Sequence, residues 1–129
     1  MVEKITALYA RFSRDDGQVT ESANITHQRQ LLQEYADHNG YTNCRFYADD
    51  GYTGTNFDRP DFNKMIEDVK NGLISTIIVK DMSRFGRNYI LVGQYVELIL
   101  PMYDVKVIDK NNVDFLIEQG QYTKEEIYN

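Results

Sequence analysis

The sequence has little cysteine, little positive charge and no long apolar run. Cys44 is the only cysteine among the 129 residues, and this excludes internal disulfides and any zinc site built from a cysteine cluster. No apolar run approaches the ~20 residues of a membrane span, and the N-terminus lacks the long apolar centre of a signal peptide. These absences favour a cytoplasmic protein without a membrane partner.

The shortage of positive charge limits how the chain could bind nucleic acid. Its 14 Lys and Arg residues face 20 Asp and Glu residues, which gives a formal net charge of -6. A domain that held nucleic acid by bulk electrostatics would be basic. Any contact with DNA must therefore come from a local cluster of cations, or from a part that lies outside this chain.

Apolar periodicity and turn residues predict four strands that alternate with three helices. The length suits one domain, and the hydrophobic fraction of 42% is enough for a core. Asn24 is placed to cap the first helix, Pro60 to open the second, and Pro101 to end the third. The strands are expected at residues 5–9, 44–48, 76–79 and 105–109, and the helices at residues 25–39, 60–71 and 88–100.

This order of elements predicts an α/β fold of three layers, with a mostly parallel sheet and helices on both faces. Residues 1–109 would form that domain, and residues 110–129 show only weak helical signals. In such folds the working groups collect at the carboxyl ends of the strands. One segment there, residues 49–59, is dense in Asp, Gly, Thr and Asn, as is typical of a mobile loop.

A candidate reactive group follows the first strand, in the stretch "YARFS". Tyr9, Arg11 and Ser13 are spaced by two, so on an extended chain they point to the same side. A serine beside an arginine that faces a crevice is arranged to attack an anion. Taken alone, however, the same pattern also fits a half-buried strand end.

Two more arginines follow the third strand, in the stretch "VKDMSRFGRN". Arg84 and Arg87 would face the same crevice, and they would share the first turn of a helix if that helix starts early. Three guanidinium groups around one hydroxyl suit a phosphodiester, because each can donate two hydrogen bonds to phosphate oxygens. Arg84 and Arg87 alone would fit a solvated turn, but their joint occurrence with "YARFS" favours a site.

Four blocks in sequence order resemble the catalytic domain of the serine recombinase (resolvase/invertase) family, and most of all its large serine recombinase or transposase branch. They are "YARFS", "NITHQRQLLQEYADHNGY", "DDGYTGTNFDRPDF" and "SRFGRN". The resemblance implies that Ser13 attacks a DNA phosphodiester to form a 5′-phosphoserine link. It also implies that Arg11, Arg84 and Arg87 bind the scissile phosphate, and that neither a metal nor another cofactor is needed.

The resemblance further implies a set of supporting residues. These are Tyr9, Gln28, Asp50, Thr53 and Arg59. The chain departs from the resolvase pattern at Ser83, where resolvases carry an aspartate before the arginine, so Asp81 is the nearest candidate for that role. Ser83 also lies at a strand exit, but only Ser13 sits in the motif that matches the family's nucleophile.

The expected partners are a DNA recombination site and further copies of the protein, as a dimer or tetramer of the full-length form. The family continues into a long helix and DNA-binding domains, which residues 110–129 do not resemble, so a catalytic fragment or a truncated product is expected. Two alternatives remain open. One is an inactive recombinase remnant, and the other is a receiver-like phosphoacceptor domain that uses Asp15, Asp16 and Asp81 around a magnesium ion.

Overall fold

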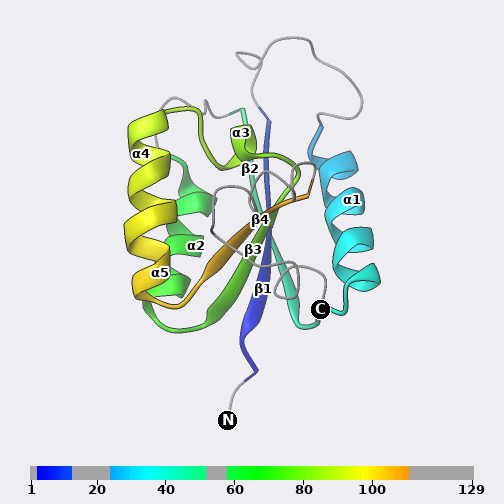
Figure 1. Cartoon of the computed structure of the whole chain (residues 1–129). Helices are drawn as coiled ribbons and strands as arrows, with labels where there is room; N and C mark the ends of the chain where they lie inside the picture. The colour runs from blue at the N-terminus through cyan, green and yellow to red at the C-terminus, as the bar shows by residue number, and fades with distance from the viewer. Residues whose placement is uncertain (1–2, 13–23, 52–57, 111–129) are drawn as a thin grey trace.

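The computed structural model of the chain describes residues 3–12, 24–51 and 58–110, which form a sheet covered by helices (Figure 1). The sheet has four parallel strands in the order β2-β1-β3-β4. The strands are β1 (Ile5–Phe12), β2 (Cys44–Asp50), β3 (Ile74–Val79) and β4 (Lys106–Asp109). The predicted α/β fold with a parallel sheet is confirmed.

Helices cover both faces of this sheet, which confirms the predicted three layers (Figure 1). One face carries α1 (Ile25–His38), and the other carries α2 (Pro60–Lys70) and a composite helix. The composite helix consists of α4 (Tyr89–Gly93), the π-helical η3 (Gln94–Ile99) and α5 (Leu100–Met102). A single turn, α3 (Met82–Phe85), follows β3 at the carboxyl edge of the sheet. Among the described residues, no helix is long and apolar enough to cross a membrane.

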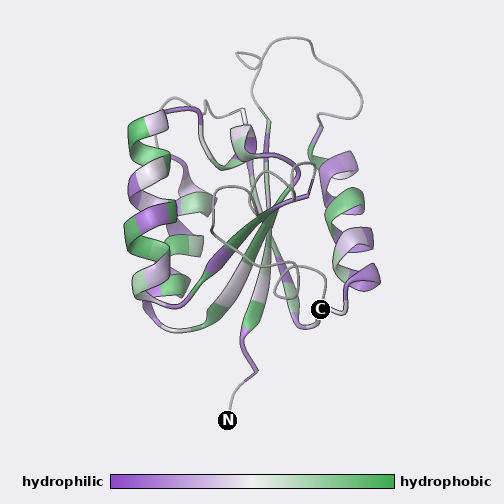
Figure 2. Ribbon diagram, viewed as in Figure 1, coloured by the Kyte–Doolittle hydropathy of each residue, from purple (hydrophilic) through white to green (hydrophobic). Residues whose placement is uncertain are grey.

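Successive residues of β1 contribute to two separate cores, as the alternation of side chains along a strand requires. Leu8 packs with Leu32 and Ala36 of α1. Its neighbours Ala7 and Tyr9 pack on the opposite face, where Phe62 of α2 belongs to the same cluster. Figure 2 shows the hydrophobic stretches of β3 and β4 between the helical layers. Burial on both faces explains the apolar runs within these strands, residues 77–79 in β3 and residues 107–108 in β4.

Two strands run further at their carboxyl ends than the sequence pattern predicted. β1 continues beyond residue 9 to Phe12, and β2 continues beyond residue 48 to Asp50. Arg11 and Asp49 are register partners in these extensions, and both are buried. The pattern ended the first strand before Arg11, and it assigned Asp49 to a loop because its stretch is dense in Asp, Gly, Thr and Asn. The ladder continues because their side chains find partners inside the protein, as described below.

The composite helix runs past the end that was predicted for it. Pro101 was expected to end the helix, but it lies within α5, which ends at Met102. Proline removes one helical hydrogen bond, and its ring clashes with the carbonyl four residues earlier in a regular α-helix. The π-helical turns of η3 come immediately before it, where the N–H of Leu100 donates to the carbonyl of Tyr95. This wider spacing accommodates the ring.

A buried tyrosine between β2 and α2 leads to a prediction about stability at high pH. The Tyr47 hydroxyl donates to Asp68 Oδ2 at 2.6 Å, and both residues are buried. Burial, together with this hydrogen bond, raises the pKa of Tyr47 to about 12. The fold therefore stabilises the neutral phenol. That contribution is complete below the unfolded pKa of about 10 and is lost as the pH rises through the folded value.

We expect Tyr47→Phe to lower the free energy of unfolding by about 1.5–3 kcal/mol at neutral pH, the usual range for a hydrogen bond to a charged group. Urea unfolding of both proteins over a pH series measures the difference. The difference should shrink as the pH rises from about 10 toward 12. A difference that stays constant across this window would contradict the linkage.

Candidate active site at the carboxyl edge of the sheet

The end of β1 is fixed by a side chain from α1. Gln28 Nε2 donates to the carbonyl oxygen of Arg11 at 3.0 Å, and the N–H of Arg11 donates to Gln28 Oε1 at 3.3 Å. Gln28 is fully buried, and its side-chain amide donates and accepts the two backbone hydrogen bonds that a residue of a neighbouring strand would otherwise make. Gln28, expected as a supporting residue, therefore lies at the backbone of Arg11, two residues before Ser13.

Two carboxylates accept hydrogen bonds from the first N–H groups of the turn α3. Asp81 is its N-cap, and Asp81 Oδ1 accepts hydrogen bonds from the N–H of Ser83, at 3.0 Å, and from the Ser83 hydroxyl. The N–H of Met82 donates to Asp109 Oδ2, at the end of β4, at 3.0 Å. Asp81 thus acts as a helix cap, and it holds the hydroxyl of Ser83.

The other end of α3 meets two guanidinium groups. Arg11 donates from Nε to the carbonyl oxygen of Arg84 at 3.3 Å, and from a terminal nitrogen to that of Ser83 at 2.5 Å. Arg59 donates to the carbonyl oxygens of Arg84 and Phe85, at 3.2 and 2.6 Å. These carbonyls carry the negative end of the helix dipole, so positive charge is stabilised beside them.

The two arginines after β3 are placed differently from each other. Arg84 is buried and donates to the carbonyl oxygen of Arg11 at 3.2 Å, so it joins α3 back to the end of β1. Arg87 is exposed and lies between α3 and α4. The two arginines were expected to share the first turn of one helix only if that helix started early, and it does not, because α3 ends before Gly86 and α4 begins at Tyr89.

A second buried network joins Tyr9, Asp49 and Arg59. The Tyr9 hydroxyl donates to Asp49 Oδ2 at 2.7 Å and accepts from Arg59 at 3.0 Å. Asp49 also accepts from the N–H groups of Asp61 and Phe62, both at 2.9 Å, in the first turn of α2. Burial strongly raises the pKa of the Tyr9 phenol, so this hydroxyl stays protonated and donates to Asp49.

Arg59 is enclosed by this network and by aromatic rings. None of its surface is exposed, and its guanidinium carbon lies 4.5 Å from the ring centre of Phe62 and 5.7 Å from that of Tyr9. Burial lowers the pKa of Arg59. In this arrangement Arg59 is a support for α3, and its guanidinium faces the protein interior.

Asp49 is the member of the site that the sequence pattern missed. It falls in a stretch rich in Asp and Gly that was assigned to a loop, whereas it is the penultimate residue of β2. Its neighbour Asp50, which was expected to support the site, is exposed. One signal was available in the sequence, since Asp49 lies two residues after the buried Tyr47 and so shares its side of the strand.

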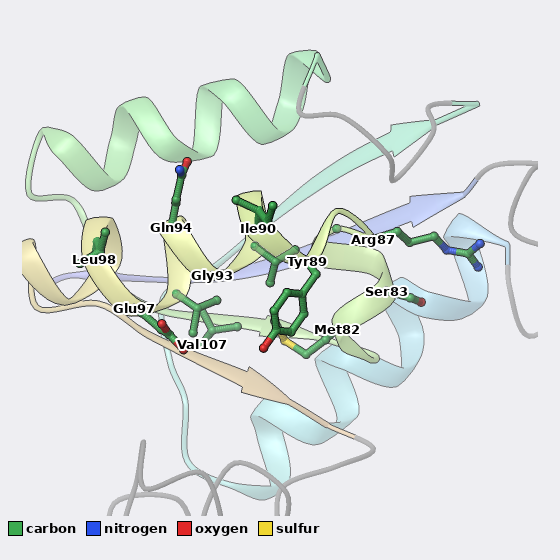
Figure 3. Close-up of a pocket in the computed structure, with 13 residues that line it drawn as sticks. Met82, Ser83, Arg87, Tyr89, Ile90, Gly93, Gln94, Glu97, Leu98 and Val107 are labelled. Atoms are coloured by element: carbon green, nitrogen blue, oxygen red, sulfur yellow. The ribbon is translucent and has the colours of Figure 1, made fainter.

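Not all of the expected site residues belong to the part of the chain that the structure describes. Ser13, Thr53 and most of the predicted loop at residues 49–59 lie outside the described residues. A largely apolar cavity of about 980 Å³ extends from α3 along α4 and η3. Figure 3 shows the side chains of Ser83 and Arg87 extending toward the same end of this cavity. Arg87 thus stands where the apolar cavity meets the carboxyl edge of the sheet.

Metal-binding residues were expected only for the receiver-like alternative. Within residues 3–12, 24–51 and 58–110, no group of three His, Cys, Asp or Glu side chains is placed to hold a metal ion. Asp15 and Asp16 lie outside these ranges, and Asp81 is engaged as the cap of α3.

Comparisons with known proteins agree with this architecture. The family model "Resolvase, N terminal domain" matches residues 6–126. A protein of Bacillus subtilis (strain 168) named "Putative DNA recombinase" is 30% identical over 116 residues, which are 90% of this chain and 21% of that protein. This chain therefore spans about a fifth of the length of that relative.

Solved structures give the same result for the fold. The N-terminal catalytic domain of TP901-1 integrase matches with a TM-score of 0.72 and 21% identity, over 97% of this chain and 100% of that domain. A resolvase family site-specific recombinase from Streptococcus pneumoniae matches with a TM-score of 0.67 and 26% identity, over 97% of this chain and 91% of that one. The chain belongs to the resolvase family of serine recombinases, and it matches their N-terminal catalytic domain. Membership of this family argues against the alternative of a receiver-like phosphoacceptor domain.

Proposed function

We propose that this chain is a catalytic domain that cuts and rejoins DNA through Ser13. The observation that carries the proposal is the convergence of Arg11 and Arg84, tied to each other by hydrogen bonds, at the end of the strand that leads into Ser13. Arginine is suited to bind phosphate because its planar group donates two parallel hydrogen bonds. Membership of the resolvase family supports the same chemistry.

In the proposed reaction the Ser13 hydroxyl oxygen attacks the phosphorus atom of a DNA phosphodiester. A bond forms between this oxygen and phosphorus, and the bond from phosphorus to the 3′ oxygen breaks. The electron pair leaves on the 3′ oxygen, which takes up a proton from solvent to become a hydroxyl, while the serine proton passes to solvent. The product is a 5′-phosphoserine ester, and attack by a 3′-hydroxyl reverses each step and rejoins DNA. The ester keeps the energy of the phosphodiester, so the proposal includes no metal and no nucleotide cofactor.

The arginines have distinct parts in this proposal. Arg84 and Arg87 bind the non-bridging oxygens of the scissile phosphate and stabilise the charge that builds in the transition state. Arg11 binds the same phosphate from beside α3, where it also holds the Ser83 and Arg84 carbonyls. DNA and further copies of the protein are the proposed partners. Because the net charge is -6, the wider DNA-holding surface is proposed to lie outside this chain.

A covalent trap tests the proposal without knowledge of the target site. The chain is incubated, in EDTA, with a pool of DNA duplexes whose central sequence is randomised and whose 3′ bridging oxygen is replaced by sulfur. Sulfur leaves as a thiolate and rejoins poorly, so an adduct accumulates. Recovery of DNA attached to protein through a 5′ phosphate supports the proposal. A chain that yields no adduct from the whole pool, even at DNA concentrations high enough to offset the DNA-holding surface proposed to lie outside it, behaves as the inactive remnant, and the proposal is then wrong.

The same trap gives a prediction for Arg84. Arg84→Ala should slow adduct formation about 100-fold, since loss of one preorganised charge contact to a transition state typically costs about 3 kcal/mol. Arg29→Ala is the matched control, because it removes the same charge at another place. Arg29 belongs to α1, and its guanidinium stacks on the ring of Phe46. Equal adduct rates for the two variants would remove Arg84 from the proposed site.

A further inference from the structure

The turn that carries Arg84 is bonded at its start to its own N-cap, Asp81, and to Asp109 at the end of β4. Three consecutive N–H groups open α3. Met82 donates to the carboxylate of Asp109 at 3.0 Å, Ser83 donates to the carboxylate of Asp81 at 3.0 Å, and Arg84 donates to the carbonyl oxygen of Asp81 at 3.1 Å. A helix leaves its first N–H groups without partners inside the helix, so these contacts fix its start.

The end of α3 is fixed in the complementary way. Its carbonyl oxygens accept hydrogen bonds from Arg11, at the end of β1, and from Arg59, just before α2. Carboxylates therefore stand at the positive end of the turn, and guanidinium groups stand at its negative end. A single helical turn is too short to be stable by itself, so its orientation depends on these charged side chains.

Of the two carboxylates at the start of α3, Asp109 is the one that comes from a distant part of the sequence. It is the last residue of β4, where it is the register partner of Val79, the last residue of β3. Only 3% of its surface is exposed, and burial of a carboxylate is unfavourable unless hydrogen bonds compensate for it. The next strand of the sheet thus supplies a buried carboxylate directly at the point where β3 passes into α3.

We propose that Asp109 is a positioning residue that acts through α3 on Arg84. Its carboxylate anchors the first N–H of the turn, while Arg84 at the other end bonds to the backbone of Arg11. Removal of the anchor lets the turn tilt about its remaining contacts and displaces the Arg84 guanidinium. Small displacements of a positioning contact reduce rates on the order of 100-fold or less. The inference rests on the function proposed for Arg84.

The test compares two aspartates in the same chain by means of the covalent trap on the randomised duplex pool. Asp109→Ala should lower the maximal rate of adduct formation on the order of 10- to 100-fold, with little change in the DNA concentration that gives half the rate. Asp109→Asn retains an acceptor oxygen for the Met82 N–H, so it should recover much of the rate. Asp68→Ala is the control, because Asp68 is equally buried but bonds to Tyr47, between β2 and α2.

Amide hydrogen exchange shows whether the loss arises at α3. The Met82 and Arg84 amides should exchange faster in Asp109→Ala than in the parent, and they should be unchanged in Asp68→Ala relative to global stability. In an Arg84→Ala background, Asp109→Ala should slow the adduct little further, since both changes act on one group.

The outcomes separate the inference from the proposed function. A parent chain that forms an adduct, together with an Asp109→Ala variant of normal rate, overturns the inference and leaves the function standing. Fully additive losses in the double variant also overturn it. If the parent forms no adduct, or if Arg84→Ala has no effect, the proposed function fails first. An Asp68→Ala variant that loses as much rate as Asp109→Ala would show a general effect of stability instead.

Discussion

Asp49→Ala is expected to lower the free energy of unfolding by about 3–5 kcal/mol, because it removes three hydrogen bonds to a buried carboxylate and leaves their donors without an acceptor. Asp49 is 2% exposed and accepts hydrogen bonds from the Tyr9 hydroxyl and from two N–H groups of α2. Its charge also faces the buried Arg59 through Tyr9. Removal of the carboxylate therefore loses a helix cap and leaves buried polar groups without their acceptor.

Asp50→Ala is the matched control, since it removes the same charge from the adjacent residue. Asp50 is exposed at the end of β2, and exposed substitutions of this kind usually change stability by less than about 0.5 kcal/mol. Urea unfolding monitored by circular dichroism measures both variants. Similar small losses for the two would mean that the network of Tyr9, Asp49 and Arg59 contributes little to the stability of the fold.

Ser13→Ala is expected to abolish the covalent protein–DNA adduct while the fold and DNA binding remain. A hydroxyl that forms the covalent bond cannot be replaced by its neighbours, so the loss should be complete rather than partial. The trap with the randomised duplex pool measures the adduct, and circular dichroism and a gel-shift assay check folding and binding. An adduct in this variant would exclude Ser13 as the nucleophile.

Ser83→Ala is the control for that prediction, because Ser83 is the other serine at a strand exit. Its hydroxyl already donates to Asp81 in the cap of α3, so its removal should alter the cap and leave adduct formation possible. A moderate loss of rate is expected, since the N–H of Ser83 still bonds to Asp81. Complete loss in Ser83→Ala, with an active Ser13→Ala, would reverse the two assignments.

The sequence predicted the fold well because the buried segments are regular. The strands around Ile77 and Leu8 are apolar on both faces, and α2 begins at Pro60 as its sequence indicates. Hydrophobic periodicity detects such segments without knowledge of their neighbours. The pattern failed where stability comes from a distant partner, as at Arg11 and Asp49, which extend two strands although both residues are charged.

The candidate site was predicted in part, for a related reason. Sequence spacing brought Arg11 and Arg84 to one edge of the sheet, and their hydrogen bonds place them there. It could not show that Arg11 and Arg59 bond to the carbonyl oxygens of α3, or that Asp109 bonds to its first N–H. These contacts join residues at least 25 positions apart, and only the fold brings such residues together.

The residue to which DNA becomes attached tests the central proposal most directly. The adduct formed by the unchanged chain is digested with nuclease and trypsin, and the peptide that carries the remaining nucleotide is identified by mass spectrometry. The proposal predicts attachment through Ser13, in the tryptic peptide of residues 12–14. Attachment through Ser83, in the peptide of residues 81–84, or through any other side chain would contradict it.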